Sequence, residues 1–293
     1  MIYAIRHTTR YVYEAPVSSA RHMLRLWPRR ELRQDVLDWR VHVRPRPAER
    51  VERPDFFGNP TDAVLIEHAH EALVIEAHGR IRLRAPALVD AAATPAWETM
   101  LDTTMAMRLA GPDAPVHFAF PSRKVPIDEA IRAYAVPSFP AGRPVLACAR
   151  DLVRRIHEDF TYEPGSTDTS TNARQALDRR AGVCQDFAHV AIGCLRSLGV
   201  PAAYVGGYLR TYPPPGRPRL VGADAMHAWI SVWCGEAAGW VDMDPTNDTL
   251  TRLDHIVTGR GRDFGDISPI DGVILGGGDH VLKVGVDVEP LVA

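Results

Sequence analysis

A cysteine, a histidine and an aspartate follow one another along the chain at points where loops meet helices or strands. Cys184 lies in "RRAGVCQDFAHVAIGCLRSLGVPA", where a glycine turn gives way to an apolar helical pattern. A helix N-terminus carries roughly half a positive charge and unpaired N–H groups, so it stabilises a thiolate and can bind an oxyanion. Cysteine is also a small hydrophobe that is commonly buried, so this position alone does not establish a nucleophile.

A thiolate that does chemistry needs a proton acceptor, usually a histidine held in its useful tautomer by a third group. His227 in "GADAMHAWISVW" begins an expected strand, and Asp244 in "GWVDMDPTNDT" ends the next one. If these strands pair antiparallel, the start of one lies near the end of the other. The alternatives are a packing or surface histidine and a turn-forming aspartate. Because the three residues occur together, we expect Cys184, His227 and Asp244 to meet.

The N-terminal residues 1–84 are dominated by alternating apolar and polar side chains. In "ALVIEAHGRIRLR" the apolar face consists of Leu73, Ile75, Ala77, Ile81 and Leu83. This period of two is typical of half-buried antiparallel strands, and it also occurs in "YAIRHTTRYVYE", "VLDWRVHVRP" and "TDAVLIEHA". We therefore predict a β-rich N-terminal domain, either a small sandwich or a meander.

The rest of the chain divides into a connecting segment and a catalytic core. Residues 85–143 are interrupted by prolines and predict no long element. Residues 144–293 begin with an amphipathic helix from Leu146 to Phe160 and a short helix capped by Thr171 or Asn172. The helix that begins near Cys184 follows, and Gly199 caps it.

The period then changes to that of strands in "AAYVGGYLR", "HAWISVW" and "GWVDMD", and "HVLKVGVDVEPLV" predicts a final strand. We therefore predict an α+β protein with a cysteine-bearing helix packed on an antiparallel sheet.

Composition excludes several classes of function. The chain has 46% hydrophobic and 24% charged residues, which is typical of a globular protein with a sizeable core. Its formal net charge of -2 favours neither nucleic acid nor a strongly acidic partner. Neither a secretion signal nor a run of about 20 apolar residues is visible, and four cysteines do not make a disulfide framework. We expect a cytoplasmic protein with reduced thiols and no membrane partner; its oligomeric state is unknown.

These motifs together resemble a known family. "GVCQDFAHV", "LRSLGVPAAYVGGYL", "HAWISV" and "GWVDMDPTN" look like the core motifs of the transglutaminase-like superfamily of papain-type cysteine enzymes. "FTYEPGSTDTST" is similar to the segment that precedes the cysteine in its bacterial branch, and the strand-rich N-terminus is similar to the bacterial transglutaminase-like N-terminal region. The resemblance implies Cys184 as nucleophile, His227 as general base and acid, and Asp244, rather than Asp242, as the residue that orients the imidazole.

The reaction implied is thiolate attack on an amide carbonyl, followed by resolution of a thioester. Water as the acceptor makes the protein a peptidase or amidase acting on a peptide or protein substrate, which is the function we favour. An amine acceptor makes it a transglutaminase, and a silent binding module is the rival from another class. Tyr162 and Gln185 are candidates for the second oxyanion donor, with Tyr162 preferred.

No metal or other cofactor is expected. A zinc site from Cys184, His189, His227 and Cys234 would lack the paired short spacings of structural zinc ligands, and no loop carries the regularly spaced acids of a calcium site. Cys148, Cys194 and Cys234 lie in helical or strand patterns and are expected to be core thiols. His189 is expected at the surface, and Asp224 could touch substrate.

Overall fold

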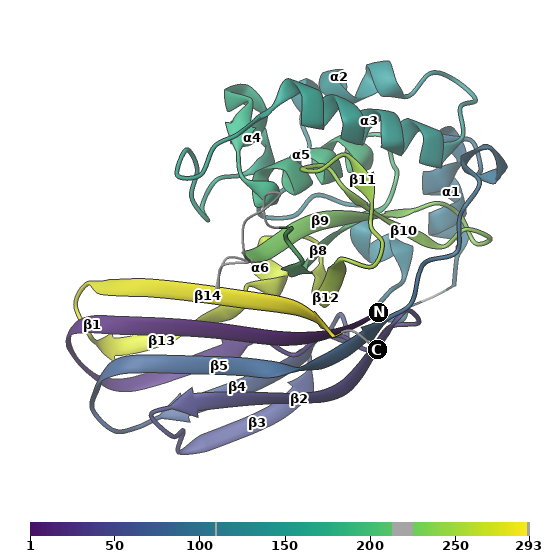
Figure 1. Ribbon diagram of the computed structural model, residues 1–293. Helices are drawn as coiled ribbons and strands as arrows, with labels where there is room; N and C mark the ends of the chain where they lie inside the picture. Colours follow the sequence, from purple (N-terminus) through teal and green to yellow (C-terminus); the bar gives the residue numbers. More distant parts are fainter. Residues whose placement is uncertain (109, 213–224, 292–293) are drawn as a thin grey trace.

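The computed structural model describes residues 1–108, 110–212 and 225–291. They form an α+β protein, as predicted from the sequence, in which a large antiparallel sheet packs beneath a smaller sheet covered by helices (Figure 1). Within these residues, no helix combines the length and apolar character needed to cross a membrane.

The large sheet is built mainly from the N-terminal third of the chain. Its strands have the order β2-β5-β1-β4-β3, and β1 pairs additionally with two strands from the C-terminus. The predicted apolar face is confirmed, because the five residues from Leu73 to Leu83 named above are all buried. The strands are β1 (Ile2–Leu24), β2 (Gln34–Arg44), β3 (Glu49–Pro54), β4 (Pro60–Ile66), β5 (His70–Leu83), β13 (Ile270–Gly276) and β14 (His280–Leu291).

The end of the chain returns to this first sheet. Strand β14 is the predicted final strand, and together with β13 it pairs antiparallel with β1 along most of its length. Val286 and Val288 of β14 are buried in the same cluster as Tyr3 and Ile5 of β1. Residues 270–291, which the sequence analysis grouped with the core, therefore complete the N-terminal sheet.

The smaller sheet carries the predicted site residues. Its order is β11-β10-β9-β8-β12, from β8 (Ala202–Leu209), β9 (Ala225–Trp233), β10 (Trp240–Asp244), β11 (Thr249–Leu250) and β12 (His255–Gly261). Only residues 251–254 join β11 to β12, although these strands lie at opposite edges. Neighbouring strands are about 4.8 Å apart, so those edges would be roughly 19 Å apart in a flat sheet. That distance is close to the longest that a connection of this length can span when fully extended. The sheet therefore curls and brings β12 toward β10.

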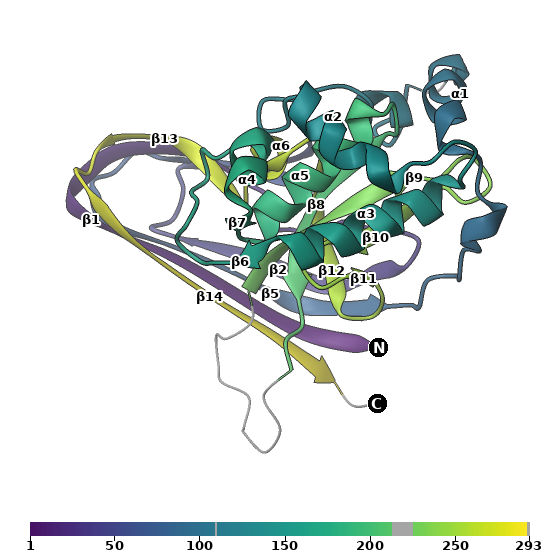
Figure 2. The same ribbon diagram turned by 90° about the horizontal axis from the view of Figure 1, so that it is seen from above.

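Helices cover the face of this sheet that points away from the N-terminal sheet (Figure 2). The central helix α5 (Cys184–Ser197) contacts β8 and β9 on one side and other helices on the other, which explains why almost all of its residues are buried. The surrounding elements are α1 (Met100–Ala106), α2 (Glu129–Ala135), α3 (Val145–Asp159), α4 (Ala173–Arg179), α6 (Phe264–Ile267), the 3-10 turns Ala91–Ala93, Trp97–Thr99, Pro115–Phe118 and Val136–Ser138, and the parallel pair β6 (Thr161–Tyr162) and β7 (Ala181–Gly182).

The two layers share a core. Tyr208 of β8 and Ile256 of β12 belong to the same buried cluster as the apolar face of the N-terminal sheet. Polar contacts add to this packing: the Gln34 side chain donates to the Val257 carbonyl at 2.7 Å and accepts from the Val257 N–H at 2.8 Å. The N-terminal sheet is therefore bonded directly to strand β12.

Candidate active site

Cys184 is the first residue of α5, at the loop-to-helix junction predicted from the sequence, and it is partly exposed. Asp186, in the first turn, accepts from the Val183 N–H at 2.8 Å and from the Thr167 hydroxyl at 2.6 Å. A Cβ at Gly182 would lie only 2.5 Å from the Asp186 carboxylate, so this close approach requires glycine. The carboxylate fixes the path of the chain directly before the cysteine.

His227 lies near the start of β9, opposite Gly207 of β8. Its Nε2 is 2.8 Å from Oδ2 of Asp244, so Nδ1 is the ring nitrogen that the carboxylate does not engage, and Cys184 is among the groups near enough to affect the pKa of this ring. Burial alone would lower the pKa of His227, but the hydrogen bonds and charges of Asp244 and Cys184 raise it to about 10. The surroundings therefore favour a protonated imidazole beside the sulfur.

Asp244 is fully buried at the end of β10. Its Oδ1 accepts the backbone N–H groups of Thr246 at 2.9 Å and Asn247 at 3.2 Å, and its Oδ2 accepts the Asn247 side-chain amide at 2.7 Å. Burial alone would raise the pKa of Asp244, but hydrogen bonds from His227, His255 and Asn247 hold it far below its usual range. The carboxylate is thus kept ionised by the donors around it.

Asp242, the neighbouring acid on β10, faces a different environment. Its side chain lies 3.5 Å from Arg260 and 4.0 Å from Arg33. It pairs with arginines rather than with His227, in agreement with the choice of Asp244 from the sequence motif.

The two candidate oxyanion donors lie on either side of the cysteine in the sequence. Tyr162 is 53% exposed, and its ring packs edge-on against Phe187 of α5. Burial and, second, the charge of Cys184 raise the pKa of its hydroxyl, which indicates that the two groups are near one another. Gln185 is half-buried as the second residue of α5. A donor role for either residue stays a prediction, and Asp224 lies outside the described residues.

His255, the first residue of β12, was not among the site residues predicted from the sequence. Its Nε2 is 3.1 Å from the same Asp244 oxygen that His227 contacts. Its ring is edge-on to Trp229, with centroids 5.2 Å apart. "LDHIV" contains no motif that distinguishes this histidine, and only the curl of the sheet brings it to Asp244.

His227, Asp244 and His255 also form a cluster that could hold a metal ion, with ligand atoms within 4.8 Å of one another. Two observations favour a hydrogen-bonded cluster instead. Both Nε2–Oδ2 separations are hydrogen-bond lengths, and the Asn247 amide donates a third bond to the same oxygen. In the part of the chain that the structure describes, the zinc set considered from the sequence does not come together as a cluster.

The remaining cysteines and His189 lie inside the core. Cys148, Cys194 and Cys234 are fully buried, which confirms them as core thiols. The predicted surface position of His189 is wrong: it is 0% exposed, packs 5.0 Å from the Tyr204 ring and accepts the Phe264 N–H at Nε2. Burial lowers its pKa to about 3. The cause is that α5 is covered on nearly all sides, so it has no solvent-facing stripe at this turn.

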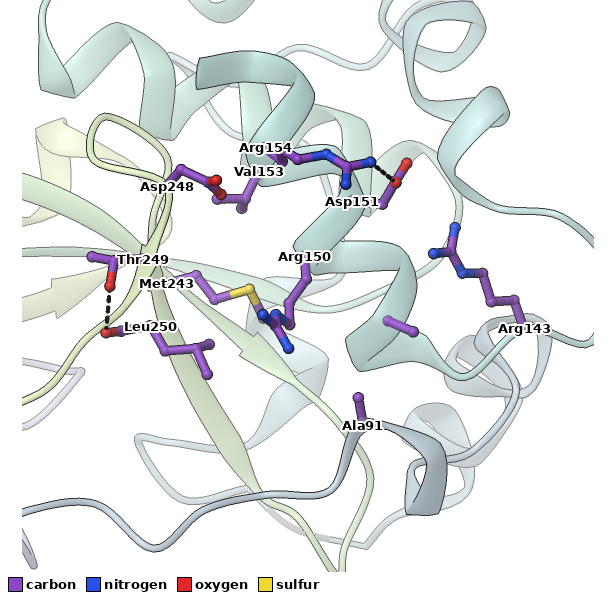
Figure 3. A pocket seen from close by; sticks show the side chains of 11 residues that line it. Ala91, Arg143, Arg150, Asp151, Val153, Arg154, Met243, Asp248, Thr249 and Leu250 are labelled. Carbon is purple, nitrogen blue, oxygen red and sulfur yellow. Dashed lines mark hydrogen bonds and ion pairs between the residues drawn. The ribbon is translucent and has the colours of Figure 1, made fainter. Parts of the chain in front are cut away.

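Two cavities lie elsewhere, and neither is lined by Cys184, His227 or Asp244. One of about 300 Å³ lies between α3 and the β10–β11 edge and is flanked by the arginines 143, 150 and 154, with Arg154 paired to Asp151 (Figure 3). The other, of about 1060 Å³, lies between the start of β2, residues 86–89 and β10, and contains the buried Arg29 and Arg260. We assign no chemistry to them.

Comparison with known proteins finds two regions of the chain that match family models. Residues 3–82 match the bacterial transglutaminase-like N-terminal region, and residues 139–245 match the transglutaminase-like superfamily. An uncharacterized protein of Mycobacterium tuberculosis is 39% identical over 295 residues, which cover 98% of this chain and 92% of that protein. A second, of Mycobacterium leprae, is 32% identical and covers 97% of each.

A solved structure shares this fold. A crystal structure described as a "Putative Cysteine Protease from Cytophaga hutchinsonii" covers 100% of this chain and 91% of its own, with a TM-score of 0.74 and 21% identity. The family match and the fold indicate an enzyme of the cysteine protease and transglutaminase type. The chain belongs to the transglutaminase-like superfamily, with the bacterial N-terminal region before its core.

Proposed function

We propose that the protein is a cysteine peptidase or amidase that cleaves a peptide or isopeptide amide through a thioester on Cys184. The observation that carries this proposal is the 2.8 Å pair of His227 and the buried Asp244, with Cys184 near enough to the imidazole to raise its pKa. A thiol, an imidazole and a carboxylate in this order are the groups that nucleophilic acyl transfer requires.

The chemistry follows from these positions. The Cys184 thiolate attacks the amide carbonyl carbon, and the C=O electron pair becomes an oxyanion. The His227 imidazolium then gives its Nδ1 proton to the leaving amine as the C–N bond breaks, which leaves a thioester and a neutral imidazole. That imidazole takes a proton from water, the hydroxide attacks the thioester, and collapse of the second oxyanion releases the acid and the thiolate.

Oxyanion stabilisation is the role proposed for the N-terminus of α5. The Cys184 N–H is in the first turn, where backbone donors have no partner within the helix. Tyr162 is the preferred second donor and Gln185 the other candidate. Each donor is worth roughly 3–4 kcal/mol in enzymes where one has been removed.

The test uses p-nitrophenyl acetate and iodoacetamide as probes. Wild-type protein should give a burst of nitrophenolate equal to the enzyme concentration, and iodoacetamide should label Cys184 and abolish the burst. Cys184→Ala should show neither, whereas Cys148→Ala, which removes a buried thiol, should keep both. A full burst from Cys184→Ala would refute the proposal.

The rival within the enzyme class is transfer of the acyl group to an amine. It has specific support because residues 139–245 match the transglutaminase-like superfamily. Incubation of a glutamine peptide with a labelled amine separates the two: attached amine supports transfer, and free acid supports hydrolysis. A wild-type Cys184 that is neither acylated nor alkylated would favour the binding module instead.

A cytoplasmic location is part of the proposal, and fractionation of the producing cells tests it.

A further inference from the structure

Two histidines from different strands share one carboxylate oxygen at the site. We propose that His255 is a positioning residue, which holds Asp244 so that His227 is aligned with Cys184. This inference rests on the proposed function, because it concerns the same reaction. It assigns a role to a residue that no sequence motif singled out.

The donors to Asp244 differ in where they come from. Thr246 and Asn247 belong to the turn that directly follows Asp244, so their three bonds fix the carboxylate only relative to its own turn. His227 is the group to be positioned. Among the described residues, His255 is the one other recorded donor, and it alone ties the carboxylate to a distant strand.

The His255 ring is itself held rigidly. Its side chain is 7% exposed, and it packs edge-on against the fully buried Trp229. The His227 ring packs against the same indole. The two rings are nearly parallel, at 26°, and their centroids are 6.2 Å apart. One buried tryptophan therefore contacts both imidazoles and limits how far either can turn.

The backbone around His255 is anchored to the N-terminal sheet. Asp254 accepts a hydrogen bond from the Tyr3 hydroxyl at 3.0 Å, and Gln34 bonds both polar backbone groups of Val257. These contacts lie one residue before and two residues after His255. The chain on both sides of His255 is thus held in place by hydrogen bonds to the N-terminal sheet.

His255 acts through Asp244 and not on the substrate. Its Nε2 faces the carboxylate, which has no proton to give, so Nε2 must donate its own hydrogen. Misplacement of a catalytic group by about 1 Å can cost roughly 100-fold in rate. Loss of this donor should therefore lower the acylation rate while substrate binding changes little.

The experiment compares His255→Ala, His255→Gln and wild type, with His78→Gln on the exposed face of β5 as control. The acylation rate with p-nitrophenyl acetate should fall roughly 10- to 100-fold in His255→Ala, with KM nearly unchanged. His255→Gln keeps an N–H donor and should recover most of the rate.

The second readout is the rate of Cys184 alkylation by iodoacetamide as a function of pH. In His255→Ala the acidic limb should move to higher pH, because a less firmly held imidazolium stabilises the thiolate less. A loss of fold stability alone would not move this limb at temperatures where the variant is folded. The control should match wild type.

The outcomes separate the two proposals. Equal rates and equal pH profiles in His255→Ala and wild type would overturn the positioning role, as would equal impairment of a folded His255→Gln and His255→Ala. If His255→Ala does not fold, His255→Gln still decides, because it should keep the wild-type profile. A wild-type Cys184 that never reacts would overturn the proposed function, and this inference with it.

Discussion

At the scale of single residues, the charge on His227 links the site to the stability of the whole chain. Burial alone would lower the pKa of this imidazole, but Asp244 and Cys184 outweigh burial and raise the pKa from 6.5 to about 10 in the folded protein. A group whose pKa is raised by folding stabilises the folded state most fully below its unfolded pKa. That contribution is lost as pH rises through the folded value.

The prediction concerns the window from about pH 6.5 to about pH 10. The free energy of unfolding of wild type should fall across it by up to about 1.4 kcal/mol per pH unit beyond the fall seen in His227→Gln. Urea denaturation at several pH values measures both proteins. Parallel curves would show that the His227 imidazole does not keep its proton in the folded state.

The residue types that do acyl chemistry are what allowed three candidate site positions to be chosen from the sequence. Cys184, His227 and Asp244 each lie next to a turn signal, and their local motifs are specific in combination. His255 could not be predicted in this way. Its contact with Asp244 depends on how far a five-stranded sheet curls, and no local pattern encodes that curvature.

At the scale of elements, Gly207 of β8 determines how closely three strands approach one another around the site. A Cβ there would lie 1.9 Å from the Ile256 carbonyl oxygen of β12 and 2.8 Å from the Trp229 ring of β9. The first contact is with backbone, which cannot swing aside. The glycine thus allows Trp229 to lie where it contacts both imidazoles.

Gly207→Ala should therefore destabilise the protein by several kcal/mol, as overpacking against a backbone does, or prevent folding. Gly285→Ala in β14 is the matched control, since a Cβ there meets nothing within 4 Å. Thermal unfolding of the two variants gives the comparison. Similar melting temperatures for both would mean that β8 and β12 can separate at low cost.

Element types were more predictable than element partners. The helix at Cys184–Ser197 follows from apolar residues at three- and four-residue steps, and Asn172 proves to be the N-cap of α4, one of the two residues expected. The pairing of β14 with β1 joins residues nearly 290 positions apart in register, such as Ile2 with Leu291. Alternation predicts a strand but not which distant strand it meets.

At the scale of the whole molecule, the N-terminal sheet supports the strand that carries His255. Gln34 is 3% exposed and bridges β2 to β12 through both backbone groups of Val257, and its amide also donates to the Arg29 carbonyl. Because of the shared core and this bridge, we expect the two layers to unfold as one cooperative unit. Unfolding of the N-terminal sheet should therefore also disrupt the arrangement of the site residues.

Gln34→Ala tests this coupling. It leaves the buried Val257 N–H and the Arg29 carbonyl without these partners, which should cost roughly 2–6 kcal/mol at 1–3 kcal/mol for each group. The expected result is a single unfolding transition at lower temperature, together with slower acylation of Cys184, because β12 is held less firmly two residues from His255. Glu67→Ala, at an exposed position outside both contacts, should change neither. Two separate transitions, with the acylation rate unaffected, would mean that the N-terminal sheet and the core fold independently and that the sheet does not support the site.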